Sequence, residues 1–271
     1  MGHEIKVMSF NVRYNNPNDG VNQFDLRRDK VLEVLEREDP DLIGFQEITP
    51  DMQEWLKKVL GSRYTVLGHG READFSNEGN PIAYRTSRFE LHSFSLEWLS
   101  ETPDVPGSRL RDLDQSGCPR IYCCAELIDL SCKKRFAFFN THTDHKGAKA
   151  RMFECEMLLD RIRKKTVPYV MTGDFNDYPE SASIKLIMDT HEELGTRDAT
   201  SSISGTFHGF SMTRMQNNNE KIDYIFTNLS HDPARSYAVE DNDDCGYFYS
   251  DHRAVCAYVS METLESISKG V

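Results

Sequence analysis

The sequence predicts an α/β protein in which helices cover mixed or largely antiparallel sheets. Three observations support this class: segments of strand character recur along the whole chain, several follow one another in hairpin order, and helical segments separate others. A strict alternation of strand and helix, typical of a purely parallel sheet, is absent. Because no repeat or linker divides the chain, we expect one domain over residues 1–271, with the last ten or so residues as a tail.

The expected strands combine apolar or aromatic residues with turn-forming neighbours. In the first, Ile5, Val7, Phe10 and Val12 recur in near alternation. Another runs from Val167 through Tyr169, Val170 and Met171 into Gly173. The first strand is expected at residues 4–12. Further strands are expected at residues 41–46, 81–85, 89–98, 121–128, 135–141, 222–227 and 253–259. We expect 81–85 to pair with 89–98, and 121–128 to pair with 135–141 through a hairpin at 129–134.

The expected helices show apolar residues every three to four positions. Val31, Val34 and Leu35 form one such face in the first helix. The helices are predicted at residues 24–37, 51–60, 148–165 and 181–189, the third being the clearest. Residues 98–120 are rich in Pro, Gly, Ser and Asp, which predicts a long loop.

The composition is that of an ordinary globular protein, with 38% hydrophobic and 28% charged residues among 271. No apolar run approaches the roughly 20 residues of a membrane span, and MGHEIKVMSF lacks the basic-then-apolar order of a signal peptide. The seven cysteines form no repeated C-x-x-C pattern, which favours free thiols in a reducing compartment. We therefore expect a cytoplasmic monomer without membrane insertion.

The formal net charge of −12 argues against a broad basic surface for non-specific binding to nucleic acid. It does not exclude a substrate that contains phosphate. Carboxylates clustered around a divalent cation add to the negative total and still create a site that attracts phosphate.

Polar residues stand where six expected strands begin or end. The segments are VMSFNV, DLIGFQEI, FAFFNTHTDH, VMTGDFND, KIDYIF and YSDHRAV. In VMTGDFND, two carboxylates and a carboxamide follow the strand within four positions, which is more than a turn requires. The residues singled out in these segments are Asn11, Glu47, Asn140, His142, Asp144, His145, Asp174, Asn176, Asp223, Ser250, Asp251 and His252.

Each segment also has a purely structural explanation. Asn11 can be satisfied by backbone groups, Glu47 can be a surface charge, and His142 can be a core histidine. Asp223 is harder to explain in this way, because an acid between apolar residues is seldom buried without a partner. The occurrence of all six segments at strand ends favours one shared site.

The residue types suit hydrolysis of a phosphate ester. Carboxylate and amide oxygens are the ligands that Mg²⁺ or Mn²⁺ prefers. A histidine with an aspartate partner can be held as a cation against developing negative charge. Another carboxylate beside an amide can orient and activate water. No glycine-rich phosphate loop, serine nucleophile elbow or thiolate motif offers a competing chemistry.

In this order, SFNVR, DLIGFQE, NTHTDH, GDFND, IDYIF and SDH resemble the motifs of the endonuclease/exonuclease/phosphatase superfamily, which includes deoxyribonuclease I, apurinic endonucleases and inositol polyphosphate 5-phosphatases. The resemblance extends from near residue 5 to near residue 260. It implies a four-layer α/β sandwich of two mixed sheets packed face to face with helices outside. RYNNPNDGVNQFDLRR and EWLSETPDVPGS look most like a microbial subgroup with poorly defined substrates.

The resemblance implies a role for each catalytic residue. Asp174 would orient or deprotonate the attacking water, and Asn176 would steady this nucleophile and a phosphate oxygen. His252, paired with Asp223, would contact the scissile phosphate. His142 would be a second histidine on the phosphate side.

The resemblance also implies a cation site and substrate contacts. Asn11, Glu47 and Asp251 would bind Mg²⁺ or Mn²⁺, with Glu47 as the principal ligand. Substrate contacts are expected from Tyr84, Arg120, His145 and Phe207. For His145 a supporting role is an equal alternative, and Phe207 can equally be a packed residue of a surface loop. We expect the loops 100–119 and 205–220 to determine which substrate is accepted.

The leading hypothesis is a metal-dependent phosphodiesterase or nuclease acting on DNA or RNA. The alternative is a phosphatase or phosphodiesterase acting on a small molecule or a lipid head group, which the acidic charge balance favours. A third hypothesis is an inactive member that binds a phosphorylated ligand, although no metal or water residue is visibly lost.

Overall fold

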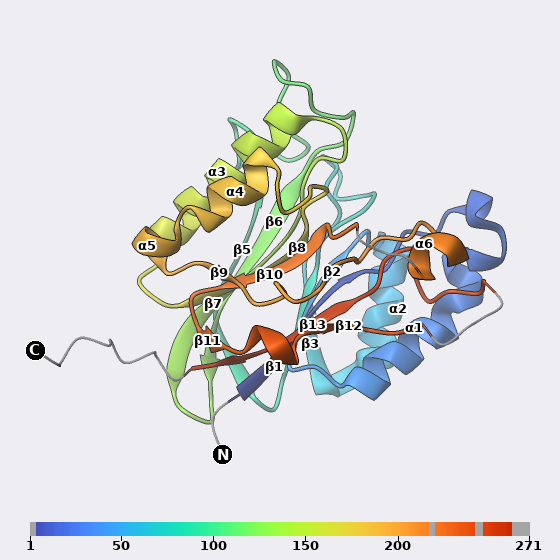
Figure 1. Ribbon diagram of the computed structural model, residues 1–271, viewed down its shortest axis with the longest axis horizontal. Coiled ribbons are helices and arrows are strands. Elements are labelled where there is room, and N and C mark those ends of the chain that lie inside the picture. Colours follow the sequence, from blue (N-terminus) through green and yellow to red (C-terminus); the bar gives the residue numbers. More distant parts are fainter. Residues whose placement is uncertain (1–3, 217–219, 242–245, 262–271) are drawn as a thin grey trace, which may run out of the picture.

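Two mixed β-sheets lie face to face in the computed structural model, which describes residues 4–216, 220–241 and 246–261 (Figure 1). The expected tail and Cys245 lie outside these residues. The first sheet has the order β11-β13-β1-β2-β4-β3, and β12 also pairs with β13. Its strands are β1 (Glu4–Asn11), β2 (Leu42–Gln46), β3 (Tyr64–Leu67), β4 (Ile82–Arg85), β11 (Ser230–His231), β12 (Tyr237–Ala238) and β13 (Val255–Ser260).

The second sheet has the order β5-β6-β7-β8-β10-β9. Its strands are β5 (Phe89–Trp98), β6 (Ile121–Asp129), β7 (Lys134–His142), β8 (Tyr169–Asp174), β9 (Arg197–Asp198) and β10 (Asp223–Thr227). Each sheet contains one parallel pair, β1 with β2 and β7 with β8, among antiparallel neighbours. The expected hairpin between β6 and β7 is confirmed.

Helices cover the outer face of each sheet, which gives four layers (Figure 1). The first sheet is covered by α1 (Phe24–Glu38) and α2 (Pro50–Leu60). The second is covered by α3 (Ala148–Arg163), α4 (Ala182–Met188) and α5 (His191–Leu194). Shorter elements are η1 (Pro17–Asn22), η2 (Gly61–Arg63), η3 (Pro233–Arg235) and α6 (Met212–Gln216). No helix in the described part of the chain is long and apolar enough to cross a membrane.

The layers follow from the alternation of side chains along the strands. In β1, Ile5 and Val7 face the core between the sheets, whereas Met8 and Phe10 face α1 and α2. Because both faces of each central strand are covered, these strands are apolar almost throughout. The expected α/β class and the four-layer sandwich are therefore confirmed.

The two sheets approach closely at Gly44 of β2. A Cβ atom there would lie 1.9 Å from Oγ1 of Thr172 and 2.4 Å from Oδ1 of Asn140. The absence of a side chain at position 44 leaves room for Asn140, whose Oδ1 accepts hydrogen bonds from Gln46 (2.7 Å) and Thr172 (3.0 Å). It also donates to the carbonyl of Phe45 at 2.7 Å. Asn140 therefore fastens β7 to β2, directly beneath the strand ends that carry the polar motifs.

The expected pairing of residues 81–85 with 89–98 is wrong. β4 pairs with β2 and β3, while β5 pairs with β6 in the other sheet. The three residues between them cross from sheet to sheet instead of forming a hairpin. Arg88 fixes this crossing, because its guanidinium binds Asp41 beside the first sheet (2.7 Å) and Asp129 in the second (3.1 Å).

Candidate active site

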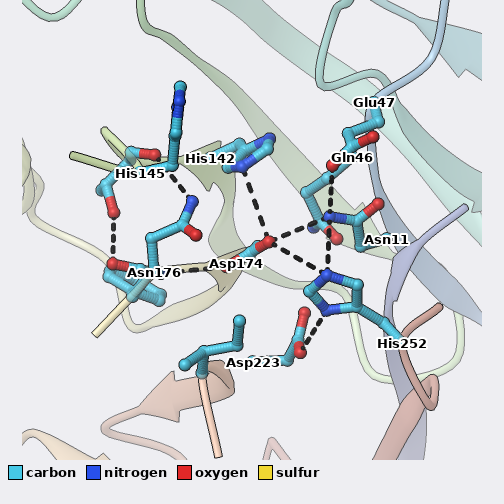
Figure 2. A network of polar contacts seen from close by, with 12 residues as sticks. Asn11, Gln46, Glu47, His142, His145, Asp174, Asn176, Asp223 and His252 are labelled. Atoms are coloured by element: carbon cyan, nitrogen blue, oxygen red, sulfur yellow. Dashed lines mark hydrogen bonds and ion pairs between the residues drawn. The ribbon is translucent and has the colours of Figure 1, made fainter. Parts of the chain in front are cut away.

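The polar strand ends meet where the two sheets face each other (Figure 2). Asn11 ends β1 and Glu47 directly follows β2, so the parallel pair brings both to one edge of the first sheet. His142 and Asp174 end the parallel strands β7 and β8 of the second sheet. Asp223 begins β10 and is the register partner of Asp174. The structure therefore brings these side chains together from both sheets.

His252 is paired with Asp223 across the gap between the sheets. Its Nδ1 atom lies 2.9 Å from Oδ2 of Asp223, and both side chains are buried. Burial alone would lower the pKa of His252, but the charges of Asp223 and Asp174 outweigh it and raise this pKa to about 10. At neutral pH the ring is therefore a cation, with Nε2 3.7 Å from Oδ2 of Asp174.

Asp174 lies at the centre of the network in Figure 2. Its Oδ2 accepts a hydrogen bond from Nδ2 of Asn11 at 2.9 Å, and its Oδ1 accepts one from the backbone N–H of Asn176 at 2.9 Å. Burial and the neighbouring charge of Asp223 raise the pKa of Asp174 to about 7. A carboxylate with this pKa can accept a proton near neutral pH.

His142 has the opposite charge state to His252. Burial, together with the charge of Arg120, lowers the pKa of His142 well below its ordinary value, so the ring is neutral. Its Nε2 lies 3.5 Å from Oδ2 of Asp174, and its Nδ1 has no hydrogen-bond partner in the described part of the chain. Asp174 thus lies between one cationic and one neutral imidazole.

Asn176 reaches the site through an unusual backbone conformation. Its φ of 49° lies in the left-handed region, which an Asn adopts more readily than most residues. Its side-chain nitrogen donates to the carbonyl of Thr143 at 3.1 Å, and the residue lines the pocket. The Gly-Asp-Phe-Asn turn therefore places Asn176 in the pocket lining, while Asp174 lies buried directly beside the lining residues His142 and His252.

Glu47 and Asp251 form a carboxylate corner on the first sheet. Oε1 of Glu47 accepts a hydrogen bond from Nδ2 of Asn11 (3.1 Å), and Oε2 accepts one from the backbone N–H of Tyr14 (3.1 Å). Arg13 contacts both carboxylates, with Nη1 3.8 Å from Oε2 of Glu47 and Nε 3.8 Å from Oδ2 of Asp251.

This corner suits a divalent cation. Burial and the charge of Glu47 raise the pKa of Asp251 even though His252 and Arg13 oppose the shift. For Glu47, burial is outweighed by the charges of Arg13 and His252, which lower the pKa, so its side chain is a carboxylate at neutral pH. Carboxylate oxygens are the donors that Mg²⁺ and Mn²⁺ prefer. Oδ1 of Asn11 accepts a hydrogen bond from the backbone N–H of Arg13 at 2.9 Å. Asn11 therefore contacts Glu47 through its side-chain nitrogen, which donates to Glu47.

Asp174, Asp223 and His252 form a second candidate metal cluster, since each offers a ligand atom within 4.8 Å of the others. The hydrogen bond from His252 to Asp223 and the high pKa of that imidazole weigh against it. A protonated imidazole has no free lone pair for a metal.

A pocket of about 460 Å³ opens above these groups. Of the expected substrate contacts, Arg120, His145 and Phe207 line it. Arg120 is buried, with Nη2 2.8 Å from Nδ1 of His145. The Phe207 ring centroid lies 4.8 Å from that of His252.

Tyr84 does not reach this pocket. Its side chain is buried in the core between the sheets, with Ile82, because alternate residues of β4 face that core. Its register partner is Leu42, at the opposite end of β2 from Glu47. The structure therefore does not support the expected contact between Tyr84 and phosphate.

Asp144 and Asp177 have structural partners. Oδ2 of Asp144 accepts a hydrogen bond from the backbone N–H of Ser116 (3.0 Å), and its Oδ1 accepts one from the backbone N–H of Gly147 (2.7 Å). Asp144 thereby joins the loop of residues 99–120 to the start of α3. Asp177 accepts from Arg151 (2.9 Å) and Ser183 (2.7 Å). Neither lines the pocket.

Sequence reasoning missed two buried arginines: Arg71, which lines the pocket, and Arg27, which supports the segments around it. This fully buried guanidinium donates to the carbonyls of Asn22 (2.7 Å), Tyr249 (2.7 Å) and Arg13 (2.5 Å). It thereby joins the segments that carry Arg13 and Asp251. A signal was present, because Phe24, Arg27 and Val31 share one face of α1, and that face is apolar apart from the arginine.

The four-layer fold and the polar strand ends define a phosphoesterase of the deoxyribonuclease I-like class. Residues 8–252 match the model of the endonuclease/exonuclease/phosphatase family. The chain belongs to this family, which confirms the resemblance seen in its motifs.

Three similar proteins illustrate the relationship. An endonuclease/exonuclease/phosphatase from Bacteroides vulgatus is 29% identical, with a TM-score of 0.82 over 96% of this chain and 99% of that chain. A mannosyl-6-phosphatase from Bacteroides thetaiotaomicron is 26% identical, with a TM-score of 0.79 over 93% and 98%. An uncharacterized protein of Acanthamoeba polyphaga mimivirus is 27% identical over 195 residues, which are 69% of this chain and 70% of that protein.

Proposed function

We propose that the protein is a divalent-metal-dependent hydrolase of phosphate esters of small molecules. The observation that carries the proposal is the position of the buried Asp174 carboxylate, whose pKa is raised to about 7. Its Oδ2 lies 3.7 Å from Nε2 of the His252 imidazolium, and His252 lines the pocket. A proton acceptor and a fixed cation at one place both favour attack of water on phosphorus, because one activates the water and the other offsets the developing negative charge.

Asp174 accepts a proton from the attacking water. The water oxygen forms the new bond to phosphorus while the bond from phosphorus to the ester oxygen breaks. The departing oxygen then takes up a proton from solvent water, and Asp174 returns its own proton to solvent. Asn11 and the backbone N–H of Asn176 hold the Asp174 carboxylate in place, so its orientation does not change during the reaction.

His252 offsets the negative charge that grows on the phosphoryl oxygens. Asp223 holds Nδ1 and thus fixes the ring orientation, which leaves the Nε2 proton for the substrate. Neutral His142 and the amide of Asn176 supply further polar contacts at the same phosphate.

Glu47 and Asp251 are the proposed metal ligands, and Asn11 positions Glu47 through its hydrogen bond of 3.1 Å. A bound Mg²⁺ or Mn²⁺ would neutralise charge on a phosphate oxygen as a Lewis acid. The oxygen donors of this corner suit either ion.

Two observations favour a small substrate over nucleic acid. The pocket of about 460 Å³ suits a compact ester, and the net charge of −12 is unfavourable for a polyanion. The likeness to a mannosyl-6-phosphatase supports a sugar phosphate as one such ester.

A nuclease or other phosphodiesterase is the second candidate. The observation in its favour is Phe207, with the Arg214 guanidinium 5.8 Å above its ring near the pocket, because a nucleobase can stack on such a pair. The sequence motifs favour this activity, whereas the pocket volume and the acidic net charge support the small-ester proposal.

A substrate panel with Mg²⁺ or Mn²⁺ tests the proposal. It includes sugar phosphates, p-nitrophenyl phosphate, bis(p-nitrophenyl) phosphate, and single- and double-stranded DNA and RNA. We expect phosphate release from small esters, a loss of about 10³-fold in kcat for Asp174→Asn, and little change for Asp177→Asn. Asp177 is the matched control because it comes from the same turn but binds Arg151 and Ser183.

Full activity of Asp174→Asn would refute the mechanism, provided that circular dichroism shows both variants to be folded. Faster cleavage of nucleic acid than of any small ester would reverse the order of the two candidates.

A further inference from the structure

Arg71 lies outside every motif of the sequence, yet its guanidinium lines the active-site pocket. The side chain is only 6% exposed. Its Nη2 donates to Oε1 of Glu78 at 3.0 Å, and the Trp98 indole N–H donates to the Arg71 carbonyl at 2.6 Å. The Arg71 guanidinium is therefore fixed by its neighbours and does not extend freely into solvent.

Arg120 lies on the same wall of the pocket. The backbone N–H of Leu99 donates to the Arg120 carbonyl at 2.7 Å, while the preceding Trp98 holds Arg71. The charges of Arg120 and Arg71 both lower the pKa of His142 and of His145. The two guanidinium groups thus act on the same part of the pocket.

Several donors of this wall lack a partner, although the pocket lining also includes the Glu78 carboxylate, which accepts from Arg71. Nε of Arg71 and both Nε and Nη1 of Arg120 are buried and have no hydrogen-bond partner within the described ranges. Asp144, 3.7 Å from Nε of Arg120, already accepts hydrogen bonds from Ser116 and Gly147. Because both arginines line the pocket, an anion bound there can pair with the two guanidinium charges, and the planar guanidinium fork matches phosphate in geometry.

His145 adds a donor to the wall. Its Nδ1 receives the hydrogen bond from Arg120, and burial together with the charge of Arg120 lowers the pKa of its ring. The neutral ring therefore carries its proton on Nε2. The wall consequently presents hydrogen-bond donors from Arg71, Arg120 and His145.

We propose that Arg71 and Arg120 form a clamp for the doubly charged phosphate of a monoester, which makes the pocket selective for phosphomonoesters over phosphodiesters. The inference rests on the proposed phosphate-ester hydrolysis and narrows its substrate class. A monoester offers three non-bridging oxygens and, above a second pKa of roughly 6, two negative charges. A diester offers two such oxygens and one charge, and its second ester group leaves a guanidinium unpaired.

The test compares p-nitrophenyl phosphate with bis(p-nitrophenyl) phosphate. For Arg71→Gln we expect kcat/KM to fall by about 10- to 100-fold on the monoester, the size expected for lost charged hydrogen bonds, and by less than about 3-fold on the diester. Arg71→Lys, which keeps the charge but loses the fork, should lose less on the monoester. Arg63→Gln, an exposed arginine of η2, is the control and should change neither value.

Equal losses on both substrates, or no loss, with folded Arg71→Gln and Arg71→Lys proteins, would overturn the clamp. Binding of inorganic phosphate, measured by calorimetry, separates this result from failure of the proposed function. If the wild type hydrolyses nothing in the panel but Arg71→Gln binds phosphate more weakly than the wild type, the clamp is supported and the proposed hydrolysis is refuted. If the wild type hydrolyses small esters but Arg71→Gln binds phosphate as tightly as the wild type, the proposed hydrolysis is supported and the clamp is refuted.

Discussion

Nδ1 of His252 lies 2.9 Å from Oδ2 of Asp223, although the two residues come from different sheets. Asp223 begins β10 of the second sheet, and His252 precedes β13 of the first. A second contact of this kind joins Asn11 of β1 to Asp174 of β8 at 2.9 Å. The candidate active site is thus held together by hydrogen bonds that cross between the sheets.

The first prediction concerns this pair. Asp223→Asn removes the charge that keeps His252 protonated and the acceptor that orients its ring. We expect kcat to fall by about 10²-fold or more, with a smaller change in KM, because the lost interaction matters most as charge develops. Steady-state kinetics on a small phosphate ester measure both constants. An unchanged kcat in a folded variant would contradict the role given to the pair.

The second prediction locates the metal. Glu47→Gln and Asp251→Asn should each weaken binding of Mn²⁺ by about 10- to 100-fold or more, since each removes a charged oxygen donor. Calorimetry or electron paramagnetic resonance measures this affinity. Asp25→Asn, an exposed residue of α1, is the control. If Asp223→Asn weakens binding and Glu47→Gln does not, the ion binds the cluster of Asp174, Asp223 and His252 instead.

The third prediction concerns Arg27. Arg27→Met leaves the carbonyls of Asn22, Tyr249 and Arg13 without their buried donor. Because each unsatisfied buried group costs about 1–3 kcal/mol, the free energy of unfolding should fall by about 3 kcal/mol or more. Urea denaturation measures the change. Arg28→Met, one position further along α1 and partly exposed, should stay within about 0.5 kcal/mol of the wild type.

The fourth prediction concerns the pH dependence of stability. Glu154 of α3 is fully buried, and burial raises the pKa of its carboxyl from 4.5 to about 8. Between these values the folded protein binds a proton that the unfolded chain has lost, so stability falls as pH rises through this window. The slope contributed by Glu154 is at most about 1.4 kcal/mol per pH unit.

Glu154→Gln removes this titration. Its stability relative to the wild type should therefore increase from pH 5 to pH 8, whatever the offset between the two proteins at pH 5. Chemical denaturation at several pH values measures the difference. A constant difference across this window would show that Glu154 is already ionised in the folded protein.

The sequence was informative where polar residues interrupt apolar strands. Asp223 between Ile222 and Tyr224 indicates a buried carboxylate, and the structure supplies its partner in His252. Neither residue alone identifies the other, because 29 positions separate them. The convergence became predictable only because six such segments occur at strand ends.

Other features could not be predicted because they depend on contacts distant in sequence. The short connection after Arg85 has the length of a hairpin, but Arg88 binds carboxylates beside both sheets and the chain crosses between them. Arg71 lies in a loop without periodic pattern, so only the folded structure, in which Trp98 donates to its carbonyl, shows that it lines the pocket. The family resemblance predicts that Tyr84 contacts substrate, but the alternation of side chains along its strand directs it to the core.

Because Asn11, Glu47 and His252 come from one sheet and His142, Asp174 and Asp223 from the other, the site exists only while the two sheets are in register. A substitution deep in the sandwich, such as Gly44→Ala, would push against Asn140 and Thr172 and displace one set of groups from the other. Turnover therefore reports directly on the alignment of the two halves of the molecule. Inactivation by heat should precede loss of secondary structure, because a shift of about 1 Å between reacting groups already costs about 10²-fold in rate.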